Sequence, residues 1–180
     1  MDAALELFSE KGLEKTSSNE IAKRAGVSIG TFYRYFSDKR DLFLEILQAH
    51  LESFVTGVYI PGEAGSLSMR EHIRRLTARA FGVFDSQRDF HRQALVTKFI
   101  DADVRRLFAD VENRQLAIIT ELLVFYGKTP GTRNLAVVAK VVHGAVENAA
   151  HAVTFLSSPI DRDSFIDELT EMIHCYITNI

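Results

Sequence analysis

The stretch SSNEIAKRAGVSIGTFYRYFSDK, residues 17–39, decides the fold of this chain. It is typical of two short helices joined by a tight turn. Ser17 with Glu20 three residues later is the signature of a capped helix start, and Gly26 can end that helix in the left-handed conformation. Ser28 can then cap a second helix. Two helices joined in this way form a helix-turn-helix, whose second helix enters the DNA major groove.

The second helix of this stretch has an apolar side and an outward side. At about 100° per residue, Phe32 and Phe36 point one way. The other side suits DNA, because hydroxyls bind phosphates, an Arg bonds a guanine edge or a phosphate, and a Gly lets backbone approach backbone. An ordinary solvated face is the alternative. With flanking positions included, the predicted DNA-binding residues are Ser18, Asn19, Ser28, Ile29, Gly30, Thr31, Tyr33, Arg34, Tyr35 and Lys39.

Four of these positions have a more specific expectation. Arg34 is the strongest candidate for a direct base contact, and Lys39 can hold a phosphate. Asn19 can reach a base edge or a phosphate. Ile29 contacts a thymine methyl or fills the base of the helix, and the sequence favours neither.

The block from Ala3 to Ile46 resembles the N-terminal domain of TetR-family transcriptional regulators. The resemblance covers about a quarter of the chain, and beyond residue 55 only the helical arrangement is similar. Ile29 departs from the family pattern, which often has Lys or Gln there. Family members also tend to carry a few more residues, often basic, before the first helix, so either this protein lacks that arm or its natural start lies upstream. The matching motifs are AALELF (3–8), Gly12, IAKRAGVS (21–28), GTFYRYF (30–36), and Lys39 with Leu42.

Composition fits one DNA-binding head and one further domain. The chain has 180 residues, 47% of them hydrophobic, which is enough for a sizeable core. Its net charge is −3, but residues 11–40 hold seven basic side chains against three acidic ones, a local +4 that we interpret as a phosphate footprint. A chance run of solvated charges is the alternative.

The single cysteine, Cys175, excludes an intrachain disulfide and argues against a thiolate metal cluster. No apolar run could span a membrane and no signal peptide is visible, so we expect the cytoplasm.

Apolar residues recur at helical spacing to the end of the chain, without strand alternation. We expect an all-α fold of about nine helices. Residues 1–50 form a three-helix helix-turn-helix DNA-binding domain, and residues 51–180 form a helical ligand-binding and dimerisation domain. Ser37 caps a fourth helix that crosses this boundary. The helices expected beside the helix-turn-helix cover residues 2–11, 38–58, 69–85, 88–98, 101–125, 133–156, and a last helix from Asp161 or Asp163 onward, with a loop at 60–68.

The helix expected at 133–156 is apolar around more than one face, so one side needs a partner. A second copy is the simplest partner, and complete burial within one chain is the alternative. Two helices from each copy would form a four-helix interface, and two-fold symmetry would place two recognition helices on a palindromic double-stranded DNA operator, about 34–36 Å apart. The resemblance agrees, since TetR-like proteins dimerise through their last two long helices. The predicted interface residues are Val142, His143, Val146, Glu147, Ala150, Phe165, Leu169 and Ile173.

His143, Glu147 and His151 recur four residues apart on that helix. A His and a carboxylate one turn apart can bind a metal, but three positions along one stripe do not converge readily on one ion. We therefore expect hydrogen-bonded or interface polar groups, with no metal site and no cofactor. Titration of these groups near neutral pH makes a pH-sensitive dimer a hypothesis.

The chain is rich in phenylalanine, with thirteen residues. Aromatic residues of the middle helices can line a cavity for a hydrophobic small molecule, although plain core packing is the commoner role. The family commonly keeps a ligand cavity among these helices. A ligand that favours another position of the fourth helix would lower operator affinity through its differential affinity for the two states. The candidate ligand-binding residues are Phe81, Phe84, Phe99, Phe108 and Phe125.

The expected function is a homodimeric repressor that an unidentified small-molecule effector releases from its operator. One alternative is a DNA-bound scaffold that acts through protein contacts without an effector. Another is an enzyme built on a helical bundle. The sequence has no Ser-His-Asp spacing, phosphate loop or metal motif, so we assign no catalytic residue. Repression or activation depends on operator position, which the chain does not encode.

Overall fold

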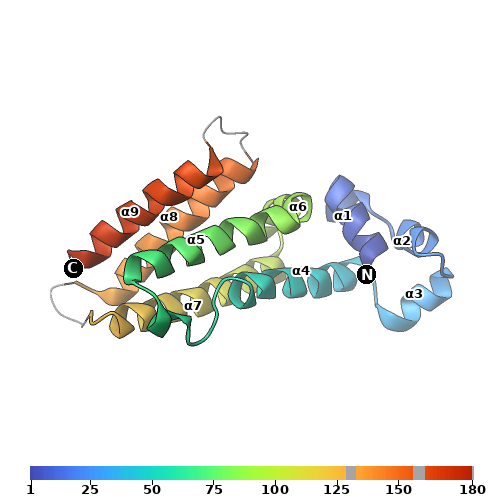
Figure 1. The fold of residues 1–180 in the computed structure, drawn as a ribbon. Coiled ribbons are helices and arrows are strands. Elements are labelled where there is room, and N and C mark those ends of the chain that lie inside the picture. Colours follow the sequence, from blue (N-terminus) through green and yellow to red (C-terminus); the bar gives the residue numbers. More distant parts are fainter. Residues whose placement is uncertain (129–132, 156–160, 180) are drawn as a thin grey trace. The chain divides into compact units, whose positions relative to one another are not determined.

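The computed structural model describes residues 1–128, 133–155 and 161–179. Within these residues the chain is helical throughout and has no strand, which confirms the predicted all-α class (Figure 1). Its elements are α1 (Asp2–Lys15), α2 (Ser18–Arg24), α3 (Ile29–Tyr35), α4 (Lys39–Thr56), the 3-10 turn η1 (Glu63–Ser66), α5 (Met69–Ser86), α6 (Arg88–Lys98), α7 (Ala102–Phe125), α8 (Leu135–Phe155) and α9 (Arg162–Thr178).

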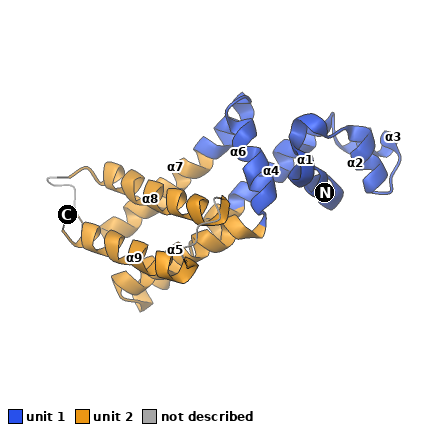
Figure 2. Cartoon of the chain, turned by 90° about the horizontal axis from the view of Figure 1, so that it is seen from above, with its two compact units in different colours: residues 1–52, 87–109 blue, residues 53–86, 110–180 orange. Residues whose placement is uncertain are grey.

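The chain divides into two compact units, coloured separately in Figure 2. The first comprises Met1–Glu52 and Gln87–Ala109, and the second comprises Ser53–Ser86 and Asp110–Ile180. Both α4 and α7 begin in the first unit and end in the second. The first unit thus contains the helix-turn-helix together with α6 and the start of α7. The division into domains at residue 50 stays a prediction.

An aromatic core holds the first unit together. Phe8 of α1, Phe43 of α4 and Phe90 of α6 have no exposed surface. The ring of Phe43 contacts the other two, with centroids 5.2 Å from Phe8 and 5.4 Å from Phe90. Burying one such side chain contributes about 1.5–3 kcal/mol. Because α1 also packs extensively along α6, the head and α6 form one body.

Two predicted helix ends differ from the structure. We expected Gly12 to end the first helix, but α1 continues to Lys15 across a break at Gly12, where φ is 79° and ψ is 174°. The cap predicted for α4 is also wrong. Asp38 caps it rather than Ser37, because the backbone N–H of Asp41 donates to Asp38 Oδ1 at 2.8 Å. Ser37 instead donates from its N–H and its hydroxyl to the carboxylate of Asp41.

Helices α5, α8 and α9 lie side by side in the second unit (Figure 1). Phe81 of α5, Ala139 of α8 and Ile166 of α9 are among its buried apolar residues. Asp161 accepts from the N–H of Ser164 at 2.9 Å and caps α9, which decides between the two predicted starts. The seam between α5 and α9 also carries ion pairs, which join Arg70 to Glu171, Arg74 to Asp167 and Asp85 to Arg162.

Two further boundaries differ in detail. The loop predicted at 60–68 contains η1, which is held because Glu63 accepts from Arg79 Nη1 at 2.5 Å and from Arg75 Nη1 at 3.2 Å. The helix predicted at 133–156 begins at Leu135, and residue 156 lies outside the described residues.

Candidate nucleic-acid interface

The start of α2 is a complete capping box, as predicted. The N–H of Glu20 donates to Ser17 Oγ at 3.3 Å, and the N–H of Ser17 donates to Glu20 Oε2 at 2.9 Å. Lys11 of α1 also donates to Glu20, at 2.6 Å. These hydrogen bonds lower the pKa of Glu20 to about 2, and the bond with Lys11 has the largest effect. The carboxylate of Glu20 therefore stays charged at the helix start. The box therefore sets the start of α2, and the ion pair of Glu20 with Lys11 connects α2 to α1.

The turn between α2 and α3 is set by Gly26, whose φ is 69°. The N–H of Gly26 donates to the carbonyl of Lys23 at 3.2 Å, and that of Val27 donates to Ala22 at 3.0 Å. This pair of bonds is the Schellman arrangement that ends a helix with a left-handed glycine. Ser28 then caps α3 by accepting from the N–H of Thr31 at 3.1 Å. The predicted helix-turn-helix is confirmed.

Helix α3 separates its two faces as the spacing predicts. Phe32 is buried and contacts Phe36, with ring centroids 5.7 Å apart. On the other side Tyr33 is 56% exposed and Tyr35 is 68% exposed. Arg34 Nη2 donates to the hydroxyl of Tyr35 at 3.1 Å, so the two side chains form one polar group in solvent.

The other predicted DNA-binding residues lie around this group or on the flanking helices. Gly30 and Ser28 are exposed, and so is Ile29, at 37%. Thr31 is half-buried, with Oγ1 2.9 Å from Ser28 Oγ. Ser18 is half-buried and Asn19 exposed at the start of α2. Their contacts with DNA stay predictions.

Lys39 has a structural role that the sequence did not suggest. Its Nζ donates to the carbonyls of Leu13, at 2.9 Å, and Glu14, at 3.0 Å, at the end of α1. An ammonium group has three donors, so two such bonds leave one for a phosphate. Lys39 therefore fixes the start of α4 to α1 in this structure, and its phosphate contact stays a prediction.

The basic footprint is smaller than the sequence count indicates. Three of the seven basic side chains of residues 11–40 already bind carboxylates of this unit. Lys11 binds Glu20, Arg24 binds Glu6 and Glu10, and Arg40 binds Asp101 and Asp103. All but one of these acidic partners lie outside residues 11–40. The charge counted over residues 11–40 therefore overstates the number of basic side chains that are available to bind phosphates.

The five predicted ligand-binding phenylalanines are divided between the two units, and their role in ligand binding stays a prediction. Phe81, Phe84 and Phe125 belong to the second unit, and Phe99 and Phe108 to the first. Phe81, Phe84 and Phe108 are buried, whereas Phe99 is 79% and Phe125 57% exposed. The ring of Phe84 contacts Phe54 and His151, with centroids 4.7 and 4.9 Å away. Of the five rings, those of Phe81, Phe84 and Phe108 are enclosed by protein, each within its own unit.

The predicted dimer residues fall into two groups. Val142, Ala150, Leu169 and Ile173 are buried in the single chain, because α8 and α9 turn these positions toward their own unit. His143, Val146, Glu147 and Phe165 are half-buried. The apolar side chains that face solvent lie elsewhere on these helices, at Val137 and Val141 of α8 and Met172 of α9. The interface stays a prediction, and these exposed positions are its available surface.

The His-rich stripe of α8 serves different contacts at each position. His143 Nε2 lies 3.0 Å from Gln115 Oε1, and its Nδ1 lies 3.9 Å from the carboxylate of Glu147. His151 instead packs its ring against Phe84 and Phe155. The hydrogen bond of His143 agrees with the expectation of hydrogen-bonded polar groups, whereas the ring packing of His151 was not predicted.

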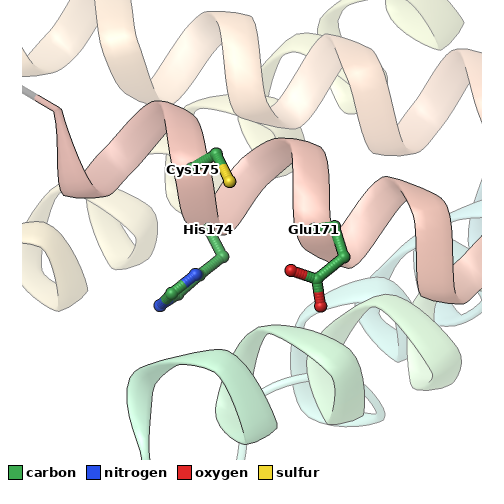
Figure 3. Close-up of side chains that lie close together, drawn as sticks. All are labelled: Glu171, His174 and Cys175. Atoms are coloured by element: carbon green, nitrogen blue, oxygen red, sulfur yellow. The ribbon is translucent and has the colours of Figure 1, made fainter.

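A different group of metal-ligating side chains was missed. The donor atoms of Glu171, His174 and Cys175 in α9 lie within 4.8 Å of one another (Figure 3). The spacing of these three residues along the sequence already indicated the group, since residues three and four apart share a helix face. A single cysteine argues against a thiolate cluster, but it does not exclude a site in which histidine and glutamate supply the other ligands.

None of the helices in the described part of the chain has the length and apolar character needed to cross a membrane.

Comparisons with known proteins agree with this geometry. Residues 1–46 match the model of bacterial regulatory proteins of the tetR family. An HTH-type transcriptional regulator of Staphylococcus aureus (strain USA300) is 46% identical over 55 residues, which is 31% of this chain and 30% of that protein. The chain thus matches less than a third of the length of this curated relative.

Solved structures extend the similarity to the fold of the whole chain. A tetR-family transcriptional regulator from Streptomyces coelicolor has a TM-score of 0.80 at 20% identity, covering 97% of this chain and 76% of that one. The regulator FadR from Bacillus subtilis in complex with stearoyl-CoA has a TM-score of 0.74 at 18% identity, covering 96% and 94%. The chain therefore carries, in residues 1–46, the N-terminal domain of the tetR family of bacterial regulatory proteins, on a fold that transcriptional regulators of this family share.

Proposed function

We propose that this chain is a homodimeric transcriptional repressor that binds a palindromic operator through α3 and is released by a small hydrophobic ligand. The carrying observation is the exposed polar side of α3. Phe32 anchors the helix from below, while Tyr33, Arg34 and Tyr35 point into solvent. Such a face offers an Arg for a base edge and hydroxyls for phosphates.

Gly30 supports a close approach of this helix to DNA. A Cβ added there would meet only Ser28 Oγ, at 3.7 Å, which is an ordinary contact. The fold therefore does not need a glycine at this position, although glycine within a helix costs about 0.5–1 kcal/mol relative to alanine. Contact between the backbone of α3 and the duplex accounts for its presence.

The outer faces of α8 and α9 support a homodimer. Val137 and Val141 are 58% and 50% exposed one turn apart on α8, and Met172 is 53% exposed on α9. A second copy would cover these side chains in an isologous interface, where each copy contributes the same surface. The resulting two-fold axis matches the symmetry of an operator with two half-sites.

The proposed effector is a molecule with an apolar chain. FadR from Bacillus subtilis, a protein of the same fold, is known in complex with stearoyl-CoA, which carries a long acyl chain. In this chain the buried rings of Phe81 and Phe84 on α5 offer apolar walls for such a group. Release would follow if the ligand binds better to a state in which α4, which continues through both units, holds α3 in another position.

A second candidate is a regulator that acts through protein contacts without an effector. Val96, Phe99 and Ile100 are 62%, 79% and 72% exposed at the end of α6 and the residues that follow it. Exposed apolar groups of this kind favour a protein contact. Release of DNA by a small molecule would decide against this alternative.

Selection of bound sequences from a random duplex library tests the proposal. We expect enrichment of two inverted half-sites whose centres lie about one helical turn apart, or a multiple of that spacing. Long-chain acyl-CoA would then be titrated into the complex with the selected duplex. No enrichment, or enrichment of one unpaired half-site, would contradict the homodimeric operator-binding protein.

A further inference from the structure

We propose that Glu171, His174 and Cys175 of α9 form a binding site for a transition-metal ion of the Zn²⁺ class. The three residues supply a carboxylate, an imidazole and a thiol, and their donor atoms all lie within 4.8 Å of one another. Figure 3 shows the three side chains together on neighbouring turns of the helix. Positions i, i+3 and i+4 share one helix face, so one ion can reach all three.

The donor set selects the kind of metal. Zn²⁺ binds thiolate, imidazole and carboxylate ligands in tetrahedral geometry, and three protein ligands leave one position for water or another molecule. Mg²⁺ and Ca²⁺ prefer oxygen ligands alone, so a site with one carboxylate and no other oxygen ligand does not suit them. The site therefore distinguishes zinc-like ions from the abundant cellular cations.

The geometry needs only side-chain movement to close. Donor atoms lie about 2.0–2.3 Å from a bound Zn²⁺, so they must approach one another more closely than they do here. Cys175 is exposed, and Glu171 and His174 are half-buried. Because none of the three is enclosed by the core, their side chains can rotate toward one ion without displacing the backbone of α9.

Arg70 of α5 competes with the metal for Glu171. Its guanidinium pairs with the carboxylate of Glu171, and the two side chains are 54% and 45% exposed. An exposed ion pair of this kind contributes little to stability, so a coordinated ion can replace it. The adjacent pair of Arg74 with Asp167, at 2.6 Å, involves no ligand of the site. Metal binding would thus exchange one of the ion pairs between α5 and α9 for coordination.

The chain's single cysteine makes the test specific. In untagged protein every thiol signal reports on Cys175, since the sequence has no other cysteine. We expect Zn²⁺ to slow reaction of the thiol with a disulfide reagent at least about tenfold, because a coordinated thiolate is a poor nucleophile toward other groups. Mg²⁺ should have no effect. We also expect Co²⁺ to give a thiolate-to-metal charge-transfer absorption, which needs no access for a reagent.

Matched variants separate this site from adventitious binding. His174→Ala and Cys175→Ser should each weaken Zn²⁺ binding at least about tenfold in a competition titration. Arg70→Gln should strengthen it, because it releases Glu171 and removes a nearby positive charge. Arg74→Gln, which breaks only the neighbouring ion pair, should leave affinity unchanged. Binding that is insensitive to His174→Ala, or a Co²⁺ complex without charge transfer, would overturn the proposal.

Discussion

Gly12 occupies a backbone conformation that is nearly exclusive to glycine, with φ at 79° and ψ at 174°. The cost of a side chain there would come from the backbone rather than from crowding. A Cβ would meet Gln93 Oε1 at 2.8 Å, but that atom is the flexible end of its side chain. Gly12 thus allows α1 to break and continue toward Lys15.

We expect Gly12→Ala to lower the free energy of unfolding by about 1–3 kcal/mol, measured by urea denaturation. Gly65→Ala is the matched control, because its backbone is not left-handed and a Cβ there has open space. The control should change stability by less than about 0.5 kcal/mol. If both variants changed the free energy of unfolding equally, the backbone conformation at position 12 would not require glycine.

His50 is a second residue whose environment has a measurable consequence. It is 3% exposed, and its Nε2 lies 2.9 Å from Nδ1 of His91. Burial lowers the pKa of His50 from 6.5 to about 4, although a hydrogen bond with Gln87 acts in the opposite direction. The unfolded chain therefore takes up a proton near pH 6.5 that the folded chain takes up only near pH 4.

The contribution of His50 to stability is complete above pH 6.5 and is lost as the pH falls toward 4. The loss should approach about 1.4 kcal/mol per pH unit within that window. Urea unfolding between pH 7.5 and 4.5 measures it, and His50→Gln should flatten the part of the profile due to this side chain. The same slope in the variant and the natural protein would assign the pH dependence to other groups.

Between helices, Arg40 connects the start of α4 to the start of α7. Its Nε donates to Asp101 Oδ2 at 2.8 Å, and its Nη2 donates to Asp101 Oδ1 at 2.9 Å and to Asp103 Oδ2 at 2.7 Å. Asp101 also accepts from the N–H of Val104 at 3.1 Å and so caps α7. The hydrogen bond with the Arg40 guanidinium is the main reason why the pKa of Asp101 is lower than its ordinary value.

A double-mutant cycle with Arg40→Gln and Asp101→Asn should give a coupling free energy of about 0.5–1 kcal/mol, modest because the side chain of Arg40 is 41% exposed. Asparagine keeps an acceptor for the helix cap, so the cycle isolates the ion pair. Chemical denaturation of the four proteins is the measurement. Additive effects would show that the contact does not stabilise the unit.

The helix-turn-helix could be predicted because its determinants are local. Ser17 and Glu20 lie within one helical turn, and Gly26 can adopt a positive φ because it has no side chain. The spacing of Phe32 and Phe36 then shows which side of α3 is buried. The cap of α4 was predicted at Ser37 and was wrong by one residue, because Asp38 accepts from the N–H of Asp41.

Contacts distant in sequence could not be predicted in this way. The partner of Arg40 is 61 residues away, and Lys39 binds carbonyls of α1 that no motif marks. Spacing along α8 shows several apolar faces but not which face its own unit covers, so it does not show that Val142 is buried within one chain. Residue type likewise does not show that Phe99, a predicted ligand-binding residue, is 79% exposed.

For the molecule as a whole, the proposed dimer leads to a direct prediction. Val141→Arg places a charge on the outer face of α8, where Val141 is 50% exposed, and should leave the fold of one chain unaffected. A charge desolvated without a partner should weaken dimerisation by about 100-fold or more. Val124→Arg, at a site 53% exposed on α7, is the control. Sedimentation that shows unchanged dimers for Val141→Arg would place the interface elsewhere.

The affinity of Gly30→Ala and Arg34→Ala for the selected duplex, measured beside their thermal stability, tests most directly whether α3 lies against DNA. Gly30→Ala should fold as stably as the natural protein or more so, yet bind about tenfold or more weakly, because its methyl group separates helix and duplex. Arg34→Ala should lose about 1–3 kcal/mol of binding if Arg34 makes a bidentate base contact. Both variants binding with unchanged affinity would contradict a DNA-binding role for this face.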